Sequence, residues 1–105
     1  MNIHKLMKQA QQMQQQLAKV QEEVATKTVE GAAGGGMVKA VASGDGKIVS
    51  ISIEQEVITQ NDKEMLEDLV VAAVNTAIDN AKAMSAEEMK KVAGDFNMPG
   101  LDNLF

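Results

Sequence analysis

The most constraining feature of this chain is an unbroken amphipathic segment over residues 2–25. Its apolar residues recur at intervals of three and four, which fits the turn of an α-helix and excludes the alternation of a strand. At 1.5 Å per residue a helix of this length extends roughly 36 Å. A single small domain is narrower than that, so part of the helix should project from the body or pair with another chain. The apolar stripe comprises Ile3, Leu6, Met7, Ala10, Met13, Leu17, Val20 and Val24.

Residues 26–58 change to strand character. Three short runs that are β-branched or alternate apolar and polar residues are separated by turn-forming residues. In the third run, Val49, Ile51 and Ile53 share one face. The connections are too short for parallel crossovers, so we expect an antiparallel three-stranded meander. The runs are 26–30, 37–42 and 47–54, separated by a glycine-rich stretch at 31–36 and by the turn Ser43-Gly44-Asp45-Gly46.

A second helix is predicted to begin near residue 62. Asn61 and Glu64 have the spacing of a capping box, and a wide apolar stripe follows them. A stripe of that width indicates burial against both the sheet and another element. The run Ser85-Ala86-Glu87-Glu88 is a second capping signal, which predicts a bend or a short third helix that stops at Gly94.

These elements define an α+β fold of the order α-β-β-β-α with a long N-terminal helix. We assign residues 1–94 to a single domain and residues 95–105 to a flexible C-terminal tail. A chain of 105 residues buries a modest share of its surface, so we expect a homodimer to supply further burial.

Composition excludes several classes of function. The chain has no cysteine and its one histidine is His4, so thiol chemistry and multi-histidine metal sites are excluded. Without a nucleophile–base pair we expect no catalytic residue, metal, cofactor or small-molecule substrate, and hence no enzyme. The glycine-rich stretch lacks phosphate-loop spacing and precedes a strand, so we interpret it as a bend or a close backbone contact. The absence of a signal-like or membrane-spanning run predicts a cytoplasmic protein without membrane contact.

Charge is distributed unevenly along the chain. The formal net charge is −5, from ten basic and fifteen acidic residues, and every basic residue is lysine. Residues 1–20 carry three lysines and no acid, whereas residues 54–80 carry seven acids and one lysine. The N-terminal helix is also rich in glutamine. From the residues alone it is either a solvated face on a helix that dimerises through its apolar stripe, or a helix that contacts phosphates.

Four segments, in order and at matching spacing, connect the chain to a known family. The chain resembles the YbaB/EbfC family of bacterial nucleoid-associated proteins over nearly its whole length. The segments are Leu6-Met7-Lys8-Gln9-Ala10-Gln11-Gln12-Met13-Gln14, Val29-Glu30-Gly31 through Gly34-Gly35-Gly36-Met37-Val38-Lys39, Asp62-Lys63-Glu64-Met65-Leu66-Glu67-Asp68-Leu69, and Met98-Pro99-Gly100.

The resemblance implies a homodimer that grips double-stranded DNA between projecting helices, alters DNA conformation, and influences nucleoid organisation and gene expression. By position, the gripping helices are residues 2–25 and 82–92. Since the chain has no arginine and no aromatic platform, we expect phosphate contacts with weak sequence preference. The DNA-binding residues implied in this way are Lys5, Lys8, Gln12, Gln15, Lys19, Lys27, Lys82, Lys90 and Lys91.

Two alternatives belong to another class. The heptad helix and small sheet are also typical of a dimeric protein-interaction or holdase-like module with no direct DNA binding, which acidity and eight methionines favour. The other alternative is a purely structural dimer whose acidic second helix docks a basic partner.

Overall fold

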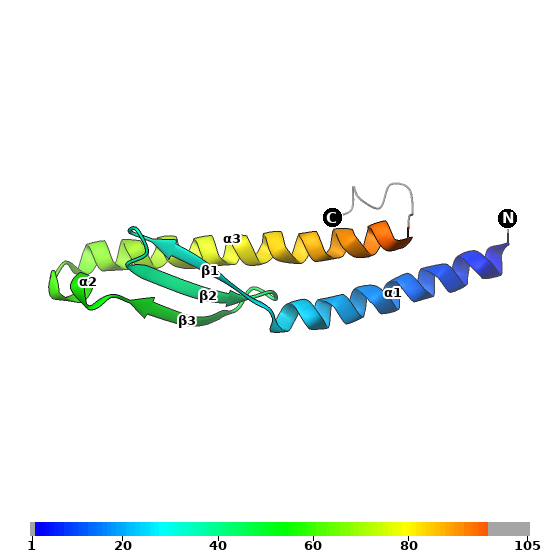
Figure 1. The fold of residues 1–105 in the computed structure, drawn as a ribbon, viewed down its shortest axis with the longest axis horizontal. Helices are drawn as coiled ribbons and strands as arrows, with labels where there is room; N and C mark the ends of the chain where they lie inside the picture. Colours follow the sequence, from blue (N-terminus) through cyan, green and yellow to red (C-terminus); the bar gives the residue numbers. More distant parts are fainter. Residues whose placement is uncertain (1, 97–105) are drawn as a thin grey trace.

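The N-terminal helix, α1, spans Ile3–Thr26, within one residue of the segment predicted from periodicity (Figure 1). It begins at Asn2, whose side-chain oxygen accepts a hydrogen bond from the His4 backbone N–H at 3.0 Å. Such a cap satisfies one of the amide groups that a helix leaves unpaired at its N-terminus. The computed structural model describes residues 2–96, and the predicted tail beyond residue 96 lies outside the described residues.

Three strands follow α1 and form one antiparallel sheet, as predicted. Strands β1 (Thr28–Ala33), β2 (Val38–Ser43) and β3 (Ile48–Ile53) lie side by side in chain order. The sheet is followed by a short helix, α2 (Gln55–Thr59), and a long helix, α3 (Lys63–Phe96). The α+β fold class predicted from the sequence is confirmed.

The core is formed by small side chains between α3 and the first two strands. Alanines at every fourth position of α3 lie directly on alternate residues of β2, and all of them are fully buried. Because alanine adds little bulk, the helix backbone lies close to the sheet. The buried set is Val38, Ala40 and Ala42 on β2, with Ala73, Ala77 and Ala81 on α3.

The glycine-rich stretch has two different roles. Strand β1 runs through Gly31, where an added Cβ would overlap the backbone of Ala73 and Ala77. The predicted close backbone contact is therefore with a helix rather than between strands, and Gly31 does not interrupt the strand. Gly34 and Gly35 form the tight turn to β2, with φ angles of 64° and 67° that favour glycine.

Strand β3 departs from the predicted clean alternation. A bulge between Val41 and Ala42 shifts the pairing, so that Ile48 rather than Val49 lies opposite Ala42. Val49 is consequently 61% exposed, although the sequence places it on the same face as Ile51 and Ile53. A bulge inserts one unpaired residue and changes which side chains point toward the core.

The second half of the chain corrects three predictions. The five-residue helix α2 was not predicted. Asp62 rather than Asn61 caps α3, accepting from the Met65 N–H at 3.0 Å, while Asn61 takes a left-handed turn conformation. Within residues 2–96 no separate helix begins at the Ser85 capping signal, because α3 continues as one helix through Ser85 and past Gly94.

The C-terminal half of α3 extends beyond the sheet and packs against α1. The two helices run antiparallel and together form an arm on one side of the sheet (Figure 1). A second apolar cluster, separate from the sheet core, joins the two helices. Because this arm projects from the sheet, the fold is 69 Å long and only 21 and 16 Å wide. This seam consists of Leu17, Val20 and Val24 on α1 and Met84, Met89 and Val92 on α3.

Candidate nucleic-acid interface

A row of lysines and glutamines occupies one face of α1. Its members are separated by three and four residues, so at 100° per residue they stay within a sector of about 80°. The centre of this sector lies about 130° from the seam, so the row faces away from α3. All of its residues are exposed. We call this set the basic stripe: Lys5, Lys8, Gln12, Gln15 and Lys19.

The electrostatic surroundings of the basic stripe are positive. Residues 2–21 contain no acidic residue, and Glu22 and Glu23 are the first acids along α1. Among residues 2–94, no carboxylate forms an ion pair with Lys5, Lys8 or Lys19. Lys5, Lys8, Gln9 and Gln12 line a shallow hollow on the helix surface. The ammonium groups therefore meet solvent, and a phosphate can approach them without displacing a protein partner.

Lys27 and Lys91 are brought together by a shared carboxylate. Glu88 Oε1 lies 3.4 Å from Lys27 Nζ and 3.5 Å from Lys91 Nζ. The hydrogen bond from Lys27, with the charges of Lys27 and Lys91, holds the pKa of the Glu88 carboxyl below its usual value. Both lysine side chains stay largely exposed, at 49% and 64%. Glu88 is thus an internal competitor for the phosphate that these lysines would bind.

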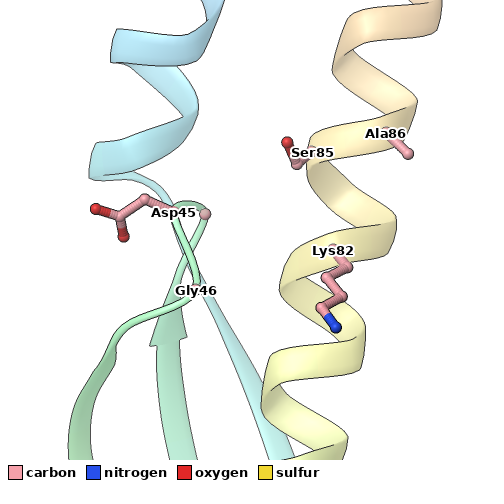
Figure 2. Close-up of a pocket in the computed structure, with 6 residues that line it drawn as sticks. Asp45, Gly46, Lys82, Ser85 and Ala86 are labelled. Atoms are coloured by element: carbon pink, nitrogen blue, oxygen red, sulfur yellow. The ribbon is translucent and has the colours of Figure 1, made fainter. Parts of the chain in front are cut away.

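Lys82 and Lys90 lie apart from the basic stripe. Lys82 borders a hollow between α3 and the hairpin turn, which is also lined by Ser85 and Ala86 (Figure 2). The Asp45 carboxylate at this turn points away from α3. Lys90 is exposed on the side of α3 roughly opposite the seam. The predicted α3 lysines therefore do not extend the α1 surface.

The two helical regions predicted to grip DNA belong to a single arm. Residues 2–25 and 82–92 pack against each other along the seam, so one chain presents one prong rather than two. The sequence predicted that both regions are helical, which the structure confirms, but it could not place them relative to each other.

Gly44 is a positioning residue that sequence reasoning missed. It lies where the hairpin turn meets the end of α1, and its N–H donates to the Lys27 carbonyl at 2.9 Å. A Cβ at this position would overlap the carbonyl oxygen and side chain of Val24. Contact with α1 at this point fixes where the arm leaves the sheet. The turn signal in the sequence marked the residue but not its contact.

Neither a metal-binding cluster nor a membrane-spanning helix is found in the part of the chain that the structure describes. No three histidine, aspartate or glutamate side chains between residues 2 and 94 converge as a metal ion would require. Of the helices described, none is both long enough and apolar enough to cross a membrane.

The fold and its surface thus define a small α+β protein with one lysine-bearing helical arm. The chain belongs to the YbaB/EbfC DNA-binding family, whose model matches residues 1–96. Among its relatives, a nucleoid-associated protein of Caldanaerobacter subterraneus subsp. tengcongensis is 59% identical over 95% of this chain and 90% of that protein. A nucleoid-associated protein of Desulfotalea psychrophila is 47% identical over 98% and 97%.

A solved structure shares the fold. The crystal structure of an uncharacterized protein from Helicobacter pylori superposes with a TM-score of 0.63, covering 90% of this chain and 96% of that one. At 21% identity this match concerns the fold alone. The family is named for DNA binding and not for a catalysed reaction.

Proposed function

We propose that this protein binds double-stranded DNA as a homodimer, with weak sequence preference, and acts at the nucleoid in the cytoplasm. The observation that carries the proposal is the basic stripe, whose lysines are exposed, lack described carboxylate partners and face away from the protein body. Family membership and the names of the relatives support it.

Lysine chemistry accounts for the weak sequence preference. A lysine ammonium is a compact point charge that suits phosphate, whereas bidentate reading of guanine is mostly performed by arginine, which this chain lacks. Glutamines between the lysines supply hydrogen bonds to phosphate and sugar. Binding then derives from release of counterions by DNA, which requires no particular base sequence.

An uncovered apolar surface supports the homodimer. Ile51 pairs with Ala40 across the sheet and therefore faces the same side, yet Ala40 is fully buried and Ile51 is 44% exposed. The reason is that α3 lies over β1 and β2 and hardly reaches β3. Exposed apolar residues on one continuous surface indicate a protein interface.

The neighbouring flank of α3 extends this surface. Asn80 donates to the Glu30 carbonyl of β1 at 2.8 Å, so that side of α3 faces β1. Val71 lies nine residues earlier, about 180° around the helix, and therefore flanks β3. Its side chain is 58% exposed. We infer that a second copy covers β3 and this flank, and that the dimer carries two arms.

Charge reversal on the basic stripe tests the proposal. We expect the triple variant Lys5→Glu, Lys8→Glu, Lys19→Glu to lose retardation of duplex DNA at low salt, because repulsion replaces every stripe contact. Its matched control is Lys39→Glu, Lys47→Glu, Lys63→Glu, which makes the same charge change at exposed positions of the body.

The two triple variants are compared by gel shift, with circular dichroism and sedimentation to show that each keeps its fold and its mass. Equal loss in both variants would mean that net charge alone governs binding. Unchanged retardation by the stripe variant would refute the site. Protection of an aggregating client protein, without DNA retardation by the natural chain, would favour the holdase-like alternative.

A further inference from the structure

We propose that the tip of the arm is a self-association surface, through which the α1 helices of two copies pair antiparallel and join two DNA-bound dimers. The surface is the N-terminal half of the apolar stripe of α1. Ile3 is 69% exposed, Leu6 43% and Met7 58%. These are among the most exposed large apolar side chains of the described chain, and they cluster on one helix end.

Continuity with the seam indicates what this surface binds. The apolar stripe of α1 is one heptad pattern, whose C-terminal part, at Leu17, Val20 and Val24, is covered by the antiparallel helix α3. The N-terminal end of α1 extends past the described end of α3 (Figure 1). The apolar stripe of α1 therefore continues beyond α3. The face of α3 that covers the C-terminal part of the stripe is aliphatic, contains methionine, and runs antiparallel to α1.

A second copy of α1 offers the same chemistry. Two tips placed antiparallel about a point between Leu6 and Met7 bring these residues of both copies together, with Ile3 opposite the small Ala10 of the other copy. Ala10 leaves room for close approach of the two backbones. The like charges do not meet in this arrangement, because the basic stripe lies on the opposite face of each helix.

The small size of the contact predicts when it forms. Three large side chains per tip bury less than about 800 Å² in total, which is the range of weak contacts. Pairing is therefore sparse among molecules free in solution and increases when DNA holds many copies close together. We take the two arms of the proposed dimer to lie on either side of a duplex, so the pair forms between dimers, and this part rests on the proposed function.

Single-cysteine crosslinking tests the pairing in the full chain. The chain contains no cysteine, so Met7→Cys introduces one thiol at the proposed contact. Ala83→Cys introduces one at an exposed position of the same arm, on the side of α3 opposite the seam and outside the basic stripe. With a short bifunctional maleimide, we expect crosslinked product from Met7→Cys to exceed that from Ala83→Cys several-fold, to rise with protein concentration, and to rise again on a long duplex. Leu6→Cys should repeat the result of Met7→Cys.

Several outcomes overturn the proposal. Equal crosslinking at the two positions, or none, means that the tips do not pair. Crosslinking that is independent of concentration places the contact within one dimer. A thiol at residue 7 that resists a small monofunctional maleimide at every concentration means that another segment of the same chain covers the stripe. A gel shift of each variant keeps the two proposals apart, because pairing without DNA retardation refutes only the DNA function, and retardation without pairing refutes only the tip contact.

Discussion

At the scale of single residues, the absence of a side chain at Gly44 determines how the arm joins the body. A Cβ there would overlap backbone and side-chain atoms of Val24, and the residue does not need glycine for its φ angle. We expect Gly44→Ala to lower the free energy of unfolding by about 1–3 kcal/mol, as overpacking does. Amides near the C-terminal end of α1 should also exchange faster with deuterium. Gly94→Ala, at a position in α3 with no neighbour within 4 Å, is the control. It should not lower the free energy of unfolding, because alanine favours a helix more than glycine does, and it should not speed exchange in α1.

Glu88 offers a second test at this scale, because it competes with DNA for two lysines. We expect Glu88→Gln to raise affinity for duplex DNA a few-fold at a fixed salt concentration and to steepen the salt dependence, since Lys27 and Lys91 then lack their carboxylate partner. Glu87→Gln removes the same charge from a neighbouring exposed position and is the control. An equal gain in both variants would show that only net charge changed.

The pKa of Glu88 fixes how its ion pairs respond to pH. Its folded-state pKa lies below the unfolded value, so the stabilisation it contributes is present above the unfolded pKa and is lost as pH falls through the folded pKa. Glu88 is therefore fully ionised at neutral pH, and its competition with DNA persists there. A pH titration of unfolding should show this small contribution disappearing only in the acidic range, and only when Glu88 is present.

At the scale of elements, long periodic segments could be predicted and short or context-dependent ones could not. The bounds of α1 could be predicted to within one residue from its periodicity, because a long helix repeats its pattern over several turns. The helix α2 has only five residues, too few for periodicity to distinguish it from a loop. The Ser85 signal failed because serine and glutamate also occur inside helices. Here α3 has already passed the sheet when it reaches Ser85, and its packing on α1 favours continuation.

In the candidate site, too, some features could be predicted from the sequence and others could not. The basic stripe could be predicted because its residues lie on one helix, where spacing alone fixes their common face. The pairing of Lys27 with Glu88 could not, because these residues are 61 positions apart and meet only through the seam. The exposure of the Ile51 side chain could not be predicted from the sequence either, because it depends on how far α3 extends across the sheet.

At the scale of the whole molecule, the charges of the chain are separated along its length. Residues 2–21, which include the N-terminal end of α1, carry lysines without acids, while the opposite end of the described fold, around the start of α3, is rich in acids. An anionic duplex is therefore attracted to one end and repelled from the other, which orients the protein despite its net charge of −5. Because surface charges are screened over about 10 Å at 0.1 M salt, the acids at the far end weaken the arm little.

This arrangement makes the salt dependence of binding a measure of how many arms engage. For duplex DNA the logarithm of affinity falls with the logarithm of salt at about −0.9 per neutralised phosphate, so a two-armed dimer should give about twice the slope of one arm.

We expect Ile51→Glu together with Val71→Glu to place charge on the uncovered apolar surface and abolish the dimer. The variant should sediment as a monomer, bind DNA weakly, and show about half the slope of the natural chain. Lys39→Glu with Lys63→Glu changes the total charge by twice as much at exposed body positions, and should keep both the mass and the slope. A monomeric variant with the full slope would mean that one arm makes all the phosphate contacts.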